Sequence, residues 1–431
     1  MTTALIIFVL MYAGMLIFSK WRVWFALAAA CCMVLFGVLP ISAVLPNINW
    51  NVIMMIAGTM GLVTLFVETG MPSRLADMIL NRVPNACWAV IALSAFSGII
   101  SAFVDNVATV LMLAPVGLEI CRKLKMNPVP VLIAIAVSSN LQGAATLVGD
   151  TTSILLGGFA NMNFMEFFWF KGKPSIFFST ELGALASILV LMFLFRKYTD
   201  KVESKVETEV DDLVPSWLMI GTVLLLICMS FVPEPEADGI LKTLHSLRSG
   251  LSCVLFALIG LVRQSIREHS ADPFARAAKE MDTDTLLLLF GLFMVIEGIR
   301  AAGVIDAAAG MFHKLAGNSP LRLYVLIVGV SVVLSAFIDN IPYVATMLPV
   351  VQGIAGLMGA DPTVYYFGLL IGATLGGNLT PIGASANITA IGILRKNGEE
   401  VSTGDFLRIG VPFTLTAVIV GSAFTWLIWG M

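Results

Sequence analysis

The chain has few charged residues. Asp, Glu, Lys and Arg make up only 12% of its 431 residues, whereas about 25% of the residues in soluble domains are charged. Apolar residues reach 58%, and apolar runs long enough to cross a hydrocarbon core of about 30 Å recur along the chain. A soluble class is therefore excluded, and we expect an integral membrane protein surrounded by lipid. The net charge of −3 provides no attraction to nucleic acid.

Metal-binding and catalytic signatures are also missing. The three histidines lie in or beside loops, so a histidine proton relay inside a span is not expected. None of the six cysteines has CxxC spacing, and we interpret them as small packing residues, with an arsenite-binding group of three thiolates as the open alternative. No HExxH or GxSxG motif occurs, so we expect neither an enzyme nor an organic cofactor. The apolar run after Thr3 lacks a basic leader and is interpreted as a first span, not a cleaved signal peptide.

The most informative feature that is present is an internal duplication. Residues 101–116 read SAFVDNVATVLMLAPV and residues 335–350 read SAFIDNIPYVATMLPV, with eight of the sixteen positions identical. Two further matches lie at nearly the same offset: the segment 146–149 (TLVG) with 380–383 (TPIG), and Gly70 with Gly303. Duplicated halves that each carry an acid at membrane depth are typical of secondary transporters built from internal repeats.

The duplication predicts an all-α polytopic membrane protein with two inverted repeats, each of about five spanning helices and one re-entrant helical hairpin. The first repeat, 1–197, is divided into a scaffold at 1–83, a hairpin at 86–121, a broken helix at 128–160 and a span at 176–196. A cytoplasmic linker follows at 198–214. The second repeat, 215–431, is divided into a scaffold at 215–316, a hairpin at 321–358, a broken helix at 363–394 and a span at 407–429. Within the scaffolds, 71–83 and 304–316 are expected to be amphipathic connecting helices.

The distribution of basic residues predicts the orientation. With the N-terminus outside and five crossings in each repeat, eighteen Lys and Arg residues fall inside and seven outside. This bias is the one expected for cytoplasmic loops, and it places both termini outside a bacterial-type inner membrane. Because five is an odd number, the two repeats then have opposite orientations, and one hairpin enters from each side.

The two hairpin tips and the two helix breaks are the candidate ion and substrate site. Helix breaks expose carbonyl and amide groups, and carbonyl, Asp and Asn oxygens suit Na+. The first half contributes Ser101, Asp105, Asn106, Thr109, Thr146, Gly149, Asp150, Thr151 and Ser153. The second half contributes Ser335, Asp339, Asn340, Asn378, Thr380, Gly383, Ser385 and Asn387. Within these sets, Na+ is expected at Asp105, Asn106 and Gly149, and at Asp339, Asn340 and Gly383.

The acids of this site favour a functional interpretation. A carboxylate at the centre of a membrane costs about 2.5–3.5 kcal/mol on the insertion scale. Asp105, Asp150 and Asp339 have no Lys or Arg nearby in their own segments, so a bound cation or a proton is the expected compensation, and the site is predicted to contain no basic residue. The alternative is that the acids only accept hydrogen bonds from hairpin amides as helix caps.

At these motifs the chain resembles the ion transporter superfamily, and within it the group of arsenite permeases, sodium–proton antiporters and P proteins, which is related to divalent-anion:sodium symporters of the citrate-transporter type. The strings SAFVDN, SAFIDN and GNLTPIGASAN carry the resemblance. It implies a homodimer that works as an elevator, with the hairpins, broken helices and last spans moving against the scaffolds. Where the carboxylate symporters have Ser-Asn-Thr at the tips, this chain has Asp-Asn-Val and Asp-Asn-Ile, which favours the antiporter-like branch.

Several functions remain open at this stage. Secondary active transport coupled to Na+ and/or H+ is the leading hypothesis, and Na+/H+ exchange is its leading form because the site is acidic. Na+-coupled symport of a small anion, such as a di- or tricarboxylate, is the first alternative and arsenite efflux the second. A passive channel fits less well, because hairpins that enter from opposite sides close a site alternately.

Overall fold

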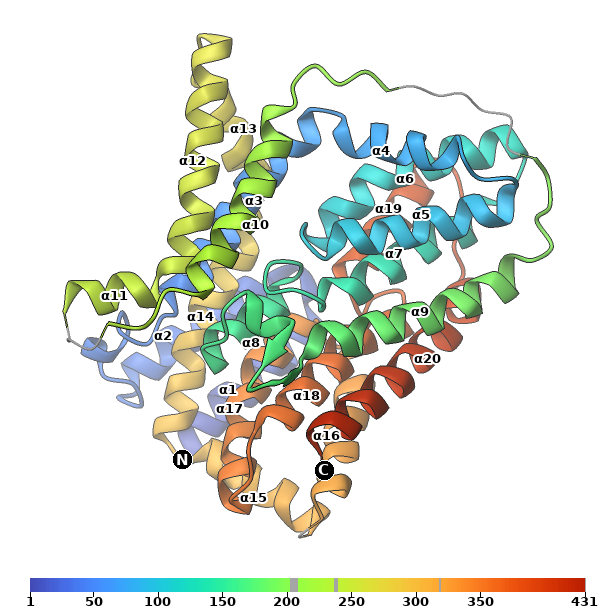
Figure 1. The fold of residues 1–431 in the computed structure, drawn as a ribbon. Helices are drawn as coiled ribbons and strands as arrows, with labels where there is room; N and C mark the ends of the chain where they lie inside the picture. Colours follow the sequence, from blue (N-terminus) through green and yellow to red (C-terminus); the bar gives the residue numbers. More distant parts are fainter. Residues whose placement is uncertain (202–207, 236–238, 318, 431) are drawn as a thin grey trace.

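The computed structural model describes residues 1–201, 208–235, 239–317 and 319–430. Part of the linker predicted at 198–214 therefore lies outside the described residues. The regular secondary structure of the described residues is helical apart from a two-stranded antiparallel sheet. Some long helices run side by side, and others cross at a steep angle (Figure 1).

The first half contains nine α-helices, of which α4 lies across the end of the molecule above α5 and α6 (Figure 1). Their bounds are α1 Thr2–Ile17, α2 Arg22–Leu35, α3 Trp50–Glu68, α4 Met71–Leu80, α5 Ala86–Ser101, α6 Asn106–Leu124, α7 Pro128–Gly143, α8 Thr151–Ala160 and α9 Ile176–Phe195. Short 3-10 turns lie at η1 Ser19–Trp21, η2 Ile41–Ala43 and η3 Met165–Phe167. The strands β1 Trp169–Phe170 and β2 Lys173–Pro174, which the sequence did not predict, join α8 to α9.

The second half repeats this plan with two additional short helices, α11 and α13. Its bounds are α10 Val214–Ser230, α11 Ile240–Ser246, α12 Arg248–Glu268, α13 Asp272–Glu280, α14 Thr283–Ala301, α15 Val304–Ala316, α16 Pro320–Ser335, α17 Asn340–Met358, α18 Thr363–Gly376, η4 Gly377–Leu379, α19 Ser385–Lys396 and α20 Thr403–Trp429. Neither α11 nor α13 was predicted, because both lie in polar stretches between spans.

Five of the helices in the described chain are long and apolar enough to cross a membrane alone, namely α3, α9, α12, α17 and α20. The bent pair α14–α15 qualifies as a sixth when it is counted together, with a 74° bend between its helices. Seven further apolar helices have 10–17 residues. The predicted number of crossings therefore stays a prediction, since length and composition alone do not decide how short helices combine into spans.

Equivalent turns in the two halves have equivalent backbone. Gly70 precedes α4 with φ 72°, and Gly303 precedes α15 with φ 73°. Both values lie in the left-handed region, which L-residues with a Cβ rarely adopt. A glycine at each position thus lets the chain turn sharply from a long helix into an amphipathic one.

Close helix packing also recurs in both halves. α3 packs against α12, and α14 packs against α2. A Cβ added to Gly58 of α3 would lie 2.5 Å from the backbone of Cys253, and one added to Gly291 of α14 would lie 2.9 Å from the backbone of Ala26. Small residues at such positions let helix backbones approach closely, as in membrane helix pairs generally. Elsewhere, α9 lies side by side with α20, α5 packs on α7, and α16 packs on α18 (Figure 1).

Candidate functional site

The first tip is the four-residue turn between α5 and α6. Its last residue, Asp105, is the N-cap of α6, and one oxygen, Oδ2, accepts hydrogen bonds from the backbone amides of Val107 (2.9 Å) and Ala108 (3.2 Å). These amides belong to the first turn of the helix, where no carbonyl of the helix can accept from them. The cap explains why Asp stands at this position, and it engages Oδ2 only.

The first break, residues 144–150, lies directly against this tip. The Thr146 hydroxyl donates a hydrogen bond to the Ala102 carbonyl. A Cβ added to Gly149 would lie 2.6 Å from the Gly143 carbonyl oxygen, 2.8 Å from that of Ser101 and 2.9 Å from that of Ala102. Three carbonyl oxygens therefore converge on the Gly149 Cα, and no larger residue fits between them.

The second tip and break repeat this geometry. Asp339 is the N-cap of α17, where its Oδ1 accepts from the Ile341 amide at 3.1 Å. The Thr380 hydroxyl donates to the Ala336 carbonyl. A Cβ added to Gly383 would lie 2.5 Å from the Gly377 carbonyl oxygen and 2.9 Å from that of Ala336. The matching strings of the sequence thus fold into matching tip-and-break contacts.

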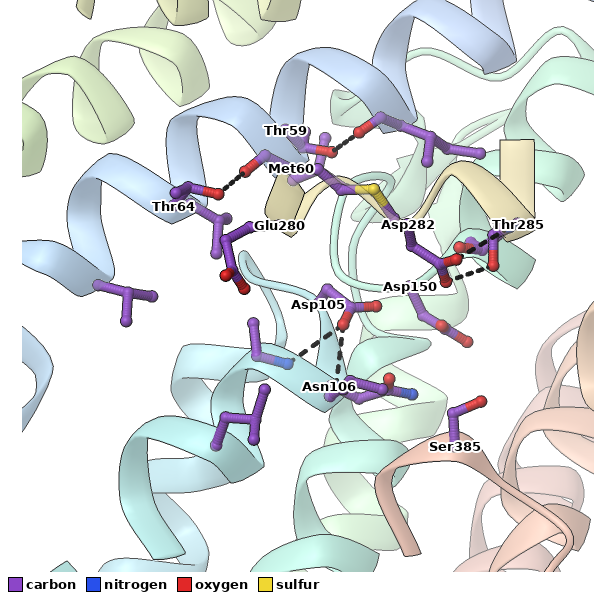
Figure 2. Close-up of a pocket in the computed structure, with 18 of the residues that line it drawn as sticks. Thr59, Met60, Thr64, Asp105, Asn106, Asp150, Glu280, Asp282, Thr285 and Ser385 are labelled. Atoms are coloured by element: carbon purple, nitrogen blue, oxygen red, sulfur yellow. Dashed lines mark hydrogen bonds between the residues drawn. The ribbon is translucent and has the colours of Figure 1, made fainter. Parts of the chain in front are cut away.

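A cavity of about 470 Å³ lies beside the first tip. Figure 2 shows the side chains of Asp105, Asp150 and Asp282 around one space, with Ser385 on the opposite side. The predicted site residues that line this cavity are Asp105, Asn106, Gly149, Asp150, Thr151, Asn340 and Ser385. Residues of both halves therefore meet at a single cavity, although the first half contributes more of them.

The carboxylates around the cavity outnumber its basic groups. Besides Asp105 and Asp150, the lining includes Glu68, Glu280 and Asp282, which were not predicted as site residues. Asp282 is the N-cap of α14, where it accepts hydrogen bonds from the Thr285 amide and hydroxyl. At the start of α8, the Thr152 hydroxyl donates to the carboxylate of Asp150, the residue before the helix, at 2.6 Å, so Asp150 too has a fixed orientation.

The prediction that the site contains no basic residue is wrong. Arg276 and Lys279 of α13 line the same cavity. Arg276 pairs there with Glu68 at 3.0 Å. At the second tip, Arg22, the first residue of α2, forms an ion pair with Asp339. These contacts could not be predicted from the sequence, because the partners come from helices that are far apart along the chain.

The remaining predicted site residues hold the backbone together away from the cavity lining. Thr109 donates to the Asp105 carbonyl, Ser153 to that of Gly143, Ser335 to that of Ala373, Asn378 to that of Val137, and Asn387 to those of Gly377 and Thr380. The hydroxyl of Ser101 is buried without a hydrogen-bond partner among the described residues.

A buried amide network connects the two halves behind the cavity. Asn106 donates to the Asn140 side chain at 2.9 Å, and Asn140 in turn donates to the Thr374 carbonyl (2.8 Å) and the Asn378 side chain (3.1 Å). Sequence reasoning missed Asn140, although an Asn inside the apolar run of α7 was a usable signal. Because the network is buried and satisfied, it fixes the position of Asn106 at the cavity.

Comparisons with known proteins identify the family. The chain matches the family described as citrate transporter over residues 6–268 and 240–430. An uncharacterized transporter of Mycobacterium tuberculosis is 33% identical over 425 residues, which cover 95% of this chain and 94% of the relative. The P protein of Homo sapiens is 28% identical over 473 residues, which cover 93% of this chain and 56% of that protein.

Solved structures support the fold. The crystal structure of the Alcanivorax borkumensis YdaH transporter matches with a TM-score of 0.61 at 14% identity, covering 89% of this chain and 87% of that chain. The family match extends the resemblance seen at the tip and break motifs to residues 6–430. The chain is an integral membrane protein that belongs to the citrate transporter family of the ion transporter superfamily.

Proposed function

We propose that the protein is a secondary active transporter that exchanges Na+ for H+, with the transported cation bound at Asp105, Asn106 and the Gly149 backbone. The observation that carries this proposal is that Asp105, Asn106, Gly149 and Asp150 line one cavity. Carboxylate, amide and unwound backbone oxygens at membrane depth are the ligands that Na+ and H+ transporters use. No organic cofactor is part of the mechanism.

The charge balance of the cavity favours a cation over an anion. Five acidic side chains line it, against the two basic side chains of α13. One of those two, Arg276, already contacts Glu68 at 3.0 Å and Glu268 at 2.8 Å. A bound Na+ or proton would offset the remaining negative charge, and competition of the two cations for the same carboxylates gives exchange. The second tip, with Asp339, Asn340 and the Gly383 backbone, has the oxygen set expected of a further Na+ position, but in this conformation Arg22 pairs with Asp339.

We further propose two inverted repeats that work as an elevator within a homodimer. The pairing of α3 with α12 and of α14 with α2 supports a scaffold formed by equivalent helices of both halves. The hairpins, the broken helices, α9 and α20 pack against one another, and together they would form the moving unit. With both termini outside an inner membrane, α13 lies inside, so the cavity lined by Arg276 and Lys279 opens to the cytoplasm in this conformation.

Na+-coupled symport of a small anion is the second candidate. The first residues of α8 and α19, Thr151 and Ser385, both line the cavity. The N-terminus of a helix has free amides and a positive dipole end, which favour an anion such as a carboxylate. Arsenite efflux has less support, because the described residues contain no group of three cysteine side chains that could form a thiolate site.

A flux assay separates these candidates. Purified protein is reconstituted into liposomes loaded with a pH-sensitive dye, and an inward Na+ gradient is applied. Exchange predicts a proton signal without any organic solute, whereas symport predicts silence until a carboxylate is added. Asp105→Asn should abolish the signal, while Asp361→Asn, the same change at a half-exposed loop position paired with Lys171, should not. Full exchange by Asp105→Asn would exclude the proposed site.

A further inference from the structure

The second tip is held by the first two helices of the chain. Arg22 of α2 pairs with Asp339. One helix earlier, the Tyr12 hydroxyl of α1 lies 2.7 Å from the Pro342 carbonyl oxygen and 2.6 Å from the Thr346 hydroxyl, both in α17. Three contacts therefore join the α1–α2 unit to the tip and to the helix that Asp339 caps.

Among the described residues, the equivalent helices α10 and α12 make no such hydrogen bond or ion pair with the first tip. α12 packs on α3 as α2 packs on α14, and α12 also begins with an arginine, Arg248. The Arg248 guanidinium donates to the Val232 carbonyl at 3.1 Å and contacts His245, whereas Asp105 lines the cavity. An arginine thus stands at the first position of both helices, and in the part of the chain that the structure describes, Arg22 pairs with a tip acid and Arg248 does not.

The pair at the second tip is largely withdrawn from solvent. The side chain of Arg22 is 26% exposed and that of Asp339 is 20% exposed. A guanidinium stays protonated under all physiological conditions, so it cannot release Asp339 by losing a proton. Any free cation that approached Asp339 would also meet the positive charge of Arg22. The two tips therefore have the same backbone geometry, but Asp105 faces a cavity that a cation can enter, whereas Asp339 is already paired with Arg22.

We propose that Arg22 is a tethered cation that occupies the second tip in place of a transported one. This inference rests on the proposed cation site at the first tip and assigns a different state to its duplicate. In this conformation the protein binds its transported cation at Asp105, and Asp339 is neutralised from within the chain. Arg22 is accordingly a residue that determines how many cations each chain takes up.

The test counts the cations bound per chain. Purified variants are titrated with radioactive sodium at alkaline pH, where a released carboxylate carries no proton. Arg22→Gln should gain one bound Na+ per chain, and Arg22→Gln combined with Asp339→Asn should lose that gain. Arg22→Lys keeps the charge and should gain none. Lys20→Gln, which removes a charge from an exposed side chain two positions away, is the matched control and should bind as the unmodified protein does.

The outcomes separate this inference from the proposed function. If Asp105→Asn loses a bound Na+ but Arg22→Gln gains none, the first site stands and the tethered cation is refuted. If the unmodified protein binds no Na+ and Arg22→Gln binds one that Asp339→Asn removes, the tethered cation stands and the first site is refuted. Should Arg22→Gln alone fail to fold, the double variant must fold because it removes the unpaired acid. Failure of the double variant as well would make Arg22 a structural residue and overturn the proposal.

Discussion

Substituting Gly149 by alanine tests the contact between tip and break. The added Cβ would lie 2.6–2.9 Å from three backbone carbonyl oxygens, those of Gly143, Ser101 and Ala102. Even the shortest ordinary carbon–oxygen contacts are about 3.3 Å, so the tip and the break must separate by roughly 0.4–0.7 Å. Backbone atoms held by helix ends on both sides yield less readily than side chains. Overpacking of this kind costs about 1–3 kcal/mol.

The expected result is a loss of stability together with a loss of cation affinity. The Gly149 backbone is one of the proposed cation ligands and would have to move away from these carbonyls, so Gly149→Ala should weaken Na+ binding as well as lower the unfolding temperature in detergent. Gly392→Ala in α19 is the matched control, because its added Cβ meets nothing within 4 Å. Alanine in a helix interior is more stable than glycine by about 0.5–1 kcal/mol, so the control should be neutral or stabilising.

The equivalent glycine makes the test sharper. Gly383→Ala meets the Gly377 and Ala336 carbonyls at 2.5 and 2.9 Å and should destabilise by a similar amount. Its effect on Na+ binding at Asp105 should be smaller, because the altered carbonyls belong to the second tip. The reasoning is refuted if Gly149→Ala unfolds at the same temperature as the unmodified protein, or if both alanine variants weaken Na+ binding equally.

Three further predictions concern the rest of the molecule. Gly58→Ala should destabilise by about 1–3 kcal/mol because its Cβ meets the α12 backbone at 2.5 Å, whereas Gly61→Ala meets a side chain at 3.6 Å and should not; thermal unfolding checks both. Gln142→Ala removes the amide that donates to Glu181 at 3.2 Å and should lower the free energy of unfolding by about 1–3 kcal/mol. An unchanged denaturation curve would contradict this prediction. Partial burial alone would raise the pKa of Asp212. Hydrogen bonds and charges from its arginine partners and a backbone amide outweigh this effect and hold the pKa below its usual value. Because a depressed pKa stabilises the fold above the unfolded pKa, Asp212→Asn should destabilise at neutral pH and progressively less below about pH 3.9; a pH-independent difference in unfolding temperature would contradict this.

The local features of the site were predictable from the sequence. Asp105 and Asp339 interrupt apolar runs, and an Asp at such a break is a strong N-cap for the helix that follows. The glycines at 149 and 383 follow threonines at the same spacing, and both threonines bond to the tip carbonyls. These contacts depend on short segments whose order in the chain is repeated, so the duplication was sufficient to identify them.

The partners of the acids were not predictable in this way. Arg22 and Asp339 are 317 positions apart, and they meet only because α2 packs on α14 beside the second tip. Asp282 reaches the cavity as the cap of α14, and Arg276 through the short helix α13, which interrupts a polar loop without an apolar signal. A charge pattern along the chain cannot reveal pairs that depend on how long helices cross.

The duplication itself gives weaker support to a shared ion-binding task than the sequence suggested. The structure shows what the two tip acids share, which is the capping of equivalent helices through hydrogen bonds to amides. Capping alone accounts for an Asp in both repeats, so the repeated motif is not evidence that both bind a cation. The acids differ in what surrounds them: Asp105 lines a cavity together with Asp150, whereas Asp339 pairs with Arg22 and has Ala384 at the position of Asp150. A transport role must therefore be assigned from these differences in charge, and they favour the first tip.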